Sequence, residues 1–317
     1  MDMPRALPVL LPERSGGPCA FGGPGWGSLL TSGQCSSARH LRHHVRTPIC
    51  LPTAMSDADA LHRLLQAHRS IRSFRTDPVD DALVDACLVD ALQGSSSSGN
   101  LNMVSVIKTR DEALRRQLHT LHGEQDMILQ APLLLTFCAD THRTRTWLAQ
   151  RGARLGFSDL VSWHVASFDA MIIAQTAALA LESRGLGLCY MGTTLFSMSA
   201  IAELLDCPDH VLPVTTLVVG WPHETPAQRD RLPPAAWIHA ERYQRPDAAS
   251  IDRDFGERER RGKARYLAVP HMAEQWRALG IESLAHYYTS PIKYDPDAFV
   301  EFSADIERAL RKNGFLS

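Results

Sequence analysis

The chain has 317 residues, of which 44% are hydrophobic and 21% are charged, which is enough for one large domain or two small domains with a buried core. Its formal net charge of -2 argues against a nucleic-acid partner held by overall charge. The seven cysteines are scattered and show no CxxC spacing, which argues against a disulfide framework and a zinc ribbon and favours a reducing cytosol.

Residues 1–55 differ in composition from the rest of the chain. They are crowded with glycine, proline and serine, and they carry five arginines against two acidic residues, a net charge of +3 before the histidines are counted. Such a segment cannot bury enough apolar surface to offset the cost of ordering it, so we expect a disordered N-terminal extension. Met55 directly precedes the first expected helix, which favours an upstream extension of the reading frame; an organelle transit peptide is the alternative interpretation.

A group of potential metal ligands lies within this extension. Its members are Cys35, His40, His43, His44 and Cys50. Their spacing matches no standard zinc pattern, so we expect no metal site there.

Two helices are expected at the start of the folded part. In the first, Leu61, Leu64 and Leu65 share one face, and Ser56 or Asp57 can cap the N-terminus. The second starts at Pro78 and ends at Gly94, before a run of serines. It carries an apolar stripe that consists of Leu83, Val84, Cys87, Leu88 and Ala91.

The middle of the chain alternates between strand and helix patterns. We expect a half-buried strand over residues 103–109, a helix over 111–121 and a fully buried strand over 133–139. The longest apolar helix follows over residues 165–184. Polar Asp169, Gln175 and Glu182 interrupt it, which predicts a buried core helix and not a membrane span.

Short strands over residues 188–190 and 212–219 complete the expected sheet, giving an α+β domain with helices on a mixed sheet. From about residue 245 the chain is highly charged, and its last expected helix covers residues 295–312. This region has no core signature of its own. We therefore expect a single domain over residues 56–317 with peripheral C-terminal helices.

A cluster of polar donors follows the first helix. Residues 68–74 read His-Arg-Ser-Ile-Arg-Ser-Phe, so two guanidinium groups and a hydroxyl lie within a few residues of one another. The planar fork of arginine donors suits phosphate oxygens, which predicts a site for a phosphate-bearing ligand. The alternative interpretation is a solvated basic helix end that favours the negative end of the helix dipole.

Gly185-Leu186-Gly187 does not predict a dinucleotide-binding turn. A dinucleotide fingerprint follows a strand and opens a helix, whereas this pair of glycines closes a helix and enters a strand. Gly185 is better interpreted as a helix C-cap.

Several motifs occur in one order along the chain. They lie at residues 68–74, 95–98, 123–125, 137–140, 185–192 and 211–233. Together, from about residue 55 to 244, they resemble the FMN-dependent nitroreductase family, specifically its type A branch of oxygen-insensitive NAD(P)H nitroreductases and flavin reductases. The resemblance implies a nitroreductase-like α+β fold, with a mixed central sheet flanked by helices, in an intertwined homodimer whose centre includes the helix over residues 165–184.

The resemblance also implies the residues that bind FMN. His68, Arg69 and Ser70 match positions at the ribityl phosphate, and Arg229 with Arg231 matches a basic pair there. The serines of the loop donated by the partner subunit are Ser96, Ser97 and Ser98.

Other matched positions surround the flavin ring. Gln125 matches an amide that reads the pyrimidine edge, and Arg72 matches a cation near N1 and the C2 carbonyl, where negative charge builds up on reduction. The strip along the ring consists of Tyr190, Met191, Gly192 and Thr193. The lack of a bulky side chain at Gly192 lets a planar ring lie close to the backbone.

The implied activity is that of a cytoplasmic FMN-dependent NAD(P)H oxidoreductase that reduces nitroaromatic compounds to nitroso and hydroxylamino products. In the implied ping-pong cycle, hydride passes from a nicotinamide to flavin N5 and the acceptor takes the electrons as a pair, so no catalytic side chain or metal is expected. No membrane or nucleic-acid partner is expected. Two alternatives stay open, a dedicated quinone or free-flavin reductase and a non-catalytic flavin-binding protein.

Two departures from the family pattern affect the expected specificity. Gly99 and Asn100 form an insertion after the serines, which can reshape the pocket wall. The basic residue expected to hold the NADPH 2′-phosphate is replaced near Ser290 and Pro291, with Lys293 as the nearby cation. The sequence therefore leaves open both the choice between NADPH and NADH and the physiological acceptor.

Overall fold

The computed structural model of the chain describes residues 56–317. The predictions for residues 1–55, namely the disordered extension, its upstream start and the absence of a metal site, lie outside the described residues.

A four-stranded sheet in the order β1-β2-β4-β3 forms the centre of the domain. The strands are β1 (Val104–Thr109), β2 (Leu133–Asp140), β3 (Gly187–Met191) and β4 (Val211–Gly220). Each pairing in the described chain is antiparallel, so the prediction of a mixed sheet is wrong for these residues. The connection from β2 to β3 does make these two strands parallel, but β4 is inserted between them and pairs with both.

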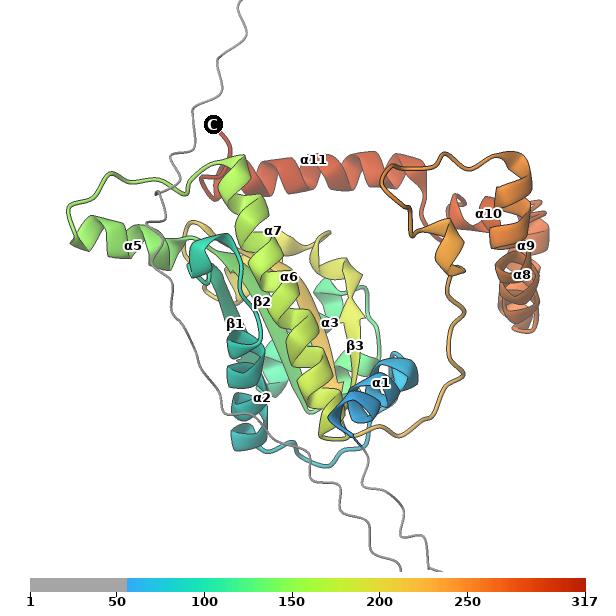
Figure 1. Cartoon of the computed structure of the whole chain (residues 1–317), viewed down its shortest axis with the longest axis horizontal. Coiled ribbons are helices and arrows are strands. Elements are labelled where there is room, and N and C mark those ends of the chain that lie inside the picture. The colour runs from blue at the N-terminus through green and yellow to red at the C-terminus, as the bar shows by residue number, and fades with distance from the viewer. Residues whose placement is uncertain (1–55) are drawn as a thin grey trace, which may run out of the picture. The chain divides into compact units, whose positions relative to one another are not determined.

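Two helices cover one face of the sheet, α2 (Asp81–Gln93) and α6 (Leu160–Ser183), as Figure 1 shows. Their small and branched side chains pack on the inward residues of β2 and β4 in the largest apolar cluster. The predicted stripe of α2 is correct in its buried members Val84, Cys87 and Ala91. The helix α6 begins earlier than expected because Asp159 caps it by accepting a hydrogen bond from the backbone of Ser162.

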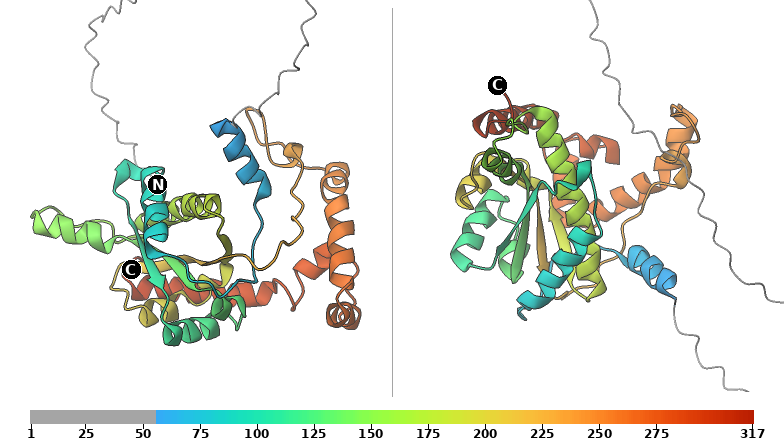
Figure 2. Two further views of the ribbon diagram at one scale, coloured as in Figure 1. Left: turned by 90° about the horizontal axis from the view of Figure 1, so that it is seen from below. Right: turned by 60° about the vertical axis from the view of Figure 1, so that its left-hand side comes forward.

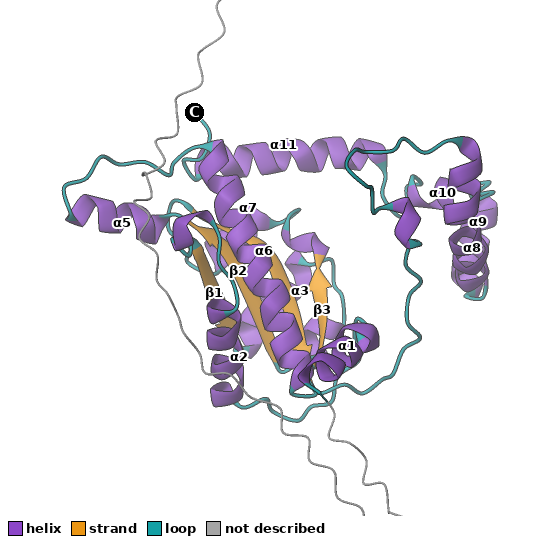
Figure 3. Ribbon diagram, viewed as in Figure 1, coloured by secondary structure: helices purple, strands orange, loops and turns teal. Residues whose placement is uncertain are grey.

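The opposite face of the sheet is covered by α3 (Glu112–Leu121), α4 (Met127–Gln130) and α7 (Met198–Leu204). The right-hand view of Figure 2 shows helices on both sides of the strands, and Figure 3 separates the two kinds of element by colour. Side chains from β2, β3 and β4 alternate between the two apolar clusters, as the period of a strand requires. The core is therefore a sheet between two helical layers.

Two further helices bury little surface in the single chain. The first, α1 (Asp57–Ala67), is capped by Ser56 as predicted, but it has no buried residue. Leu61 and Leu65 are 53% and 49% exposed, so the apolar face that the sequence predicted lies open. The second, α5 (His142–Gln150), follows β2.

The C-terminal region consists of α8 (Ala248–Leu267), α9 (Pro270–Ala278), α10 (Leu284–Tyr288) and α11 (Pro296–Lys312). The first three share a small apolar cluster of their own that includes Trp276 and Tyr287, whose rings stack. The sequence did not reveal this cluster, because its aromatic residues are dispersed among charged ones. The last helix packs instead against α7.

Three short 3₁₀ turns complete the secondary structure. They are η1 (Ser98–Asn100), η2 (Gly192–Thr194) and η3 (Pro234–Ala236).

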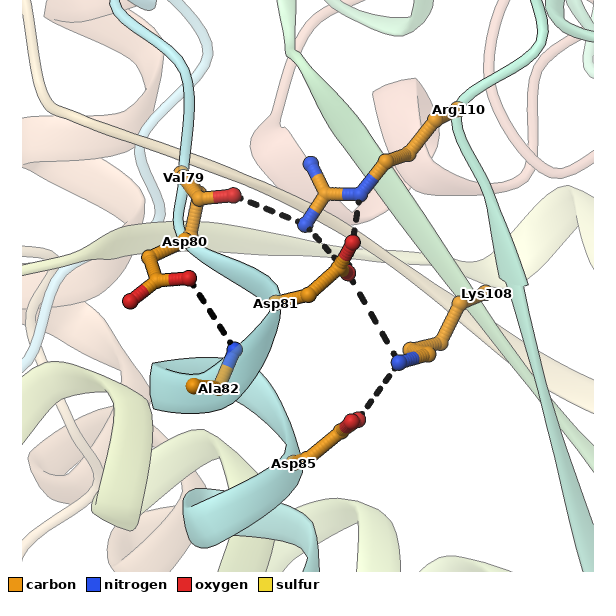
Figure 4. Close-up of polar contacts among 7 residues, drawn as sticks. All are labelled: Val79, Asp80, Asp81, Ala82, Asp85, Lys108 and Arg110. Carbon is orange, nitrogen blue, oxygen red and sulfur yellow. Dashed lines mark hydrogen bonds and ion pairs between the residues drawn. The ribbon is translucent and has the colours of Figure 1, made fainter.

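A group of charged side chains ties the start of α2 to the end of β1 (Figure 4). The Arg110 guanidinium donates to the Asp81 carboxylate and to the carbonyl of Val79. Lys108 lies between Asp81 and Asp85. The hydrogen bond from Arg110 lowers the pKa of Asp81 below its usual value. These contacts fix where the chain enters α2 after residues 68–74.

Among the described residues, α6 is the one helix long and apolar enough to cross a membrane by length and composition. Half of its most apolar window is buried inside the protein. That burial is the pattern of a core helix that packs on a sheet, and it agrees with the interpretation of the sequence.

Gly187→Ala should destabilise the domain, because residue 187 touches the segment that lies beside β3. A Cβ at this position would lie 2.7 Å from Cγ1 of Ile71 and 3.0 Å from Cγ of Pro222. Overpacking of this kind costs about 1–3 kcal/mol of the free energy of unfolding, measured by urea denaturation. Gly156→Ala is the control, since its Cβ would meet no atom within 4 Å. Equal stability of the two variants would contradict the packing argument.

Candidate functional site

Residues 68–74 run along the outer edge of β3. The backbone N–H of Ile71 donates to the carbonyl of Leu188 at 2.9 Å, and Phe74 forms a β-bridge with Pro222 after the end of β4. Ile71 and Phe74 are each 5% exposed and anchor the segment in the apolar cluster under the sheet. The polar residues between these anchors are thereby held beside β3 in a fixed register.

One cavity of about 290 Å³ brings the two predicted basic segments together. Its lining consists of His68, Arg69, Ser70, Arg72, Pro226, Ala227, Gln228, Arg229, Arg231 and Arg265. Six of the residues predicted to bind the cofactor are in this set. Five guanidinium groups around one cavity create a strongly positive potential that attracts a phosphate.

Arg265 belongs to α8, and sequence reasoning did not place it at the site. Its Nε is buried without a hydrogen-bond partner in the described part of the chain, and its guanidinium lies 5.1 Å from the ring centre of Tyr266. A buried guanidinium nitrogen without a partner is an available donor for an anion. The sequence carries a run of arginines here, but the region was expected to form peripheral helices and not part of the site.

An ion pair holds α8 against the loop that carries Arg229 and Arg231. Arg258 donates through Nε to the carboxylate of Asp230 at 2.8 Å. Burial opposes the ionisation of Asp230, but the hydrogen bond and the charge of Arg258 outweigh it and lower the pKa of this carboxyl. The ion pair therefore positions α8 and the loop that carries Arg229 and Arg231 relative to each other.

Two carboxylates that the sequence analysis missed hold residues 68–74 in place. Glu224 accepts hydrogen bonds from the backbone N–H groups of Arg72 and Ser73, at 2.6 and 3.0 Å. Glu182 of α6 lies 2.7 Å from Nδ1 of His68. Burial raises the pKa of Glu182, and the nearby His68 partly offsets this effect.

A second cavity of about 400 Å³ shares His68 and Arg69 with the first. Although this cavity is larger, the carboxylates of Glu182 and Glu224 line it, and its one guanidinium group is that of Arg69. The smaller cavity therefore suits a phosphate better on grounds of charge.

The predicted ring strip at the end of β3 presents its backbone. Tyr190 points to the α6 side, where its hydroxyl donates to Gln175 at 3.1 Å, and burial raises its pKa to about 12. Met191 is 1% exposed and points to the opposite apolar cluster. A Cβ at Gly192 would meet no atom within 4 Å, so the space beside this residue is open in the chain.

Gln125 and Thr193, two other predicted contacts, are joined through a residue that the sequence analysis missed. The side-chain amide of Gln125 donates to the carbonyl of His122, and Nδ1 of His122 lies 2.9 Å from Oγ1 of Thr193. His122 is fully buried, which lowers its pKa to about 4. Neither Gln125 nor Thr193 lines the basic cavity.

The serine loop is bound to α6 and does not line the basic cavity. Ser95 hydrogen-bonds to Thr176, and the hydroxyl of Ser97 donates to Asp169. Asp169 also accepts from the backbone of Met103 at 2.9 Å. Within one chain, Ser96 and Ser97 therefore lie outside the lining of the basic cavity, and the role of residues 96–98 in a partner's site stays a prediction.

No group of three or more metal-ligating side chains occurs within residues 56–317.

Comparisons with known proteins identify the family of this chain. The Nitroreductase family model matches residues 65–221. An oxygen-insensitive NADPH nitroreductase of Salmonella typhimurium is 38% identical over 181 residues, which cover 57% of this chain and 73% of that protein. An FMN reductase (NADPH) of Bacillus subtilis is 34% identical over 178 residues, which cover 56% of this chain and 71% of that protein.

Solved structures support the same conclusion. B. megaterium NfrA2 matches with a TM-score of 0.69 and 31% identity, covering 81% of this chain and 98% of that one. The family predicted from the ordered motifs is confirmed. The chain is an oxidoreductase that belongs to the nitroreductase family, in the branch of NADPH nitroreductases and FMN reductases.

Proposed function

We propose that this protein is an FMN-dependent NAD(P)H oxidoreductase that reduces nitroaromatic compounds by paired-electron transfer in a ping-pong cycle. The observation that carries the proposal is the cavity in which Arg72 and Arg231, from distant parts of the chain, meet beside β3. Relatives named as nitroreductases and FMN reductases support it. The products are nitroso and hydroxylamino compounds.

The residues present fit FMN. A phosphate needs charge-assisted donors, and the cavity offers guanidinium groups, among them that of Arg265, whose Nε has no hydrogen-bond partner within residues 56–317. A planar ring needs an open backbone edge, which Gly192 provides. When bound, FMN accepts electrons from a nicotinamide and passes them to the acceptor.

The chain's own residues bind the cofactor and orient it. Arg69, Ser70, Arg229 and Arg231 hold the phosphate, while Arg72 supplies a fixed positive charge that stabilises negative charge at the ring. Its position is defined because Glu224 fixes the backbone at residue 72. Gln125 and residues 190–193 complete the site along the ring.

The electron donor is NADPH or NADH. Lys293, the cation near the replaced position at residues 290–291, lies over the ring of Tyr294 at 4.9 Å. The ratio of kcat/KM for the two donors measures the preference.

The protein acts as a cytoplasmic homodimer. Large apolar side chains on one surface of α6 are exposed in the single chain, with Val161 at 71% and Phe168 at 60%. An exposed apolar patch on a helix whose other residues pack in the core supports an interface between subunits. The partner would bring its serine loop, residues 96–98, to the neighbouring site.

Two alternatives have specific tests. For a dedicated quinone or free-flavin reductase, kcat/KM with quinone or FMN would exceed that with nitroarenes by a wide margin. For a non-catalytic flavin-binding protein, bound FMN would resist bleaching by NADPH and NADH under anaerobic conditions.

Purified protein should bind FMN and oxidise NAD(P)H faster when a nitroarene is added in air. Arg231→Gln should weaken FMN binding about tenfold or more, because it removes a charge-assisted contact to the phosphate. Fluorescence titration with FMN measures the dissociation constant. Arg75→Gln is the matched control, since Arg75 pairs with Asp77 and does not line the cavity. A wild-type protein that cannot be reconstituted with FMN would overturn the proposal.

Gly192→Ala should separate binding from stability. The added methyl meets no atom of the chain, so the free energy of unfolding should stay within about 0.5 kcal/mol of wild type. A ring lying on this strip would collide with the methyl and bind about tenfold more weakly. Titration with FMN and urea denaturation measure the two effects, and unchanged FMN affinity would remove residue 192 from the ring strip.

Phe168→Glu should dissociate the homodimer, because it places a charge in the apolar surface of α6. Light scattering after size exclusion should give twice the 35.1 kDa chain mass for wild type and the chain mass for the variant. Val300→Glu on α11 is the control, since Val300 is 70% exposed on a different helix and should leave the mass unchanged. A monomeric wild type would contradict the assignment.

A further inference from the structure

The turn that ends α3 is bonded to the turn that ends β3. Nδ1 of His122 lies 2.9 Å from Oγ1 of Thr193, and the hydroxyl of Ser197 donates to the carbonyl of Leu121 at 2.7 Å. Gln125 donates to the carbonyl of His122 at 2.9 Å. His122 therefore connects two parts of the proposed ring site, Thr193 through its buried side chain and Gln125 through its backbone carbonyl.

His122 is electrically neutral under ordinary conditions. It is fully buried, and burial lowers its pKa to about 4, well below the usual value for histidine. A neutral imidazole carries its proton on one of its two nitrogens, so one nitrogen donates and the other accepts. The direction of the bond to Thr193 depends on which nitrogen is protonated.

The surroundings of Nε2 decide this choice. Nε2 is buried and has no hydrogen-bond partner among the described residues. A proton on Nε2 would be a buried donor without an acceptor, which is rarer and more costly in proteins than an unused acceptor. The proton therefore belongs on Nδ1, where it is donated to Oγ1 of Thr193.

This tautomer sets the polarity of the Thr193 hydroxyl. When Oγ1 accepts a hydrogen bond from His122, its own proton is free to point elsewhere. Thr193 is half-buried and directly follows Gly192, where the chain leaves space open. The free proton is thus available at the strip proposed to lie along the ring.

We propose that His122 is a positioning residue that makes Thr193 a hydrogen-bond donor to the group bound along residues 192–193, and thereby favours the reduced form of that group. This inference rests on the proposed function. Reduction adds negative charge to the ring, and a donor fixed in place stabilises that charge. The hydrogen bond therefore stabilises the reduced ring more than the oxidised ring, which gains less from the same donor.

The test measures the ratio of FMN dissociation constants, oxidised over reduced, from the midpoint potentials of bound and free FMN. Thr193→Val and His122→Leu should each lower this ratio about tenfold, which is about 30 mV for a two-electron couple. His122→Asn should keep most of the ratio, because its amide can donate from a position close to that of Nδ1.

Thr194→Val is the matched control in the same turn. Its hydroxyl is already used internally, donating to the carbonyl of Met191 at 2.8 Å. The variant should lose stability but leave the ratio unchanged. The double variant of His122→Leu with Thr193→Val should be no worse than either single variant, because both remove one interaction. A ratio unaffected by His122→Leu, or additive losses in the double variant, would overturn the proposal.

A second measurement does not need FMN. Nitrogen-15 NMR of histidine-labelled protein without added flavin, with His122→Asn used to assign the signal, should show the proton of His122 on Nδ1 at pH 7. A proton on Nε2 would overturn the inference even if FMN binding and nitroarene reduction are established. Failure of FMN binding with the proton on Nδ1 would instead contradict the proposed function.

Discussion

The site depends on the attachment of residues 68–74 to the edge of β3. The bond from Ile71 to Leu188 sets the register, and the buried side chains of Ile71 and Phe74 make that register costly to change. Cationic side chains on flexible stems gain selectivity for an anion when their backbone is fixed, because less conformational freedom is lost on binding. Because β3 is an edge strand, the backbone groups on its outer side are available to residues 68–74. In a central strand, neighbouring strands would occupy the backbone groups on both sides.

Acidic residues hold the segments of this basic site in place. Glu224 holds the backbone of Arg72, Glu182 orients His68, and Asp230 connects the loop to Arg258. Each carboxylate is occupied by a backbone or side-chain partner, so it does not neutralise the guanidinium groups that line the cavity. The arrangement gives rigidity without removing the positive potential on which the proposed phosphate binding depends.

The sequence predicted most elements, because hydrophobic period, caps and glycine or proline stops are local signals. It located all four strands of the sheet and the long core helix, and it identified the family. It misjudged the sheet as mixed, because strand neighbours depend on the insertion of β4, which has no local signal. His122, Glu182 and Arg265 were missed for a related reason: their importance comes from contacts with residues far away in the chain. The serine run was recognised by its composition, yet its bonds to α6 could not be predicted.

The contact between Asp230 and Arg258 couples the proposed anion site to a part of the chain that has its own small apolar cluster. Local opening of α8 would withdraw Arg265 from the cavity and at the same time release the carboxylate between Arg229 and Arg231. That carboxylate would then compete intramolecularly with an incoming phosphate for the same two arginines. The affinity of the cavity is therefore thermodynamically linked to the folding equilibrium of the C-terminal helices, and an occupied cavity would in turn protect α8 from proteolysis and amide exchange.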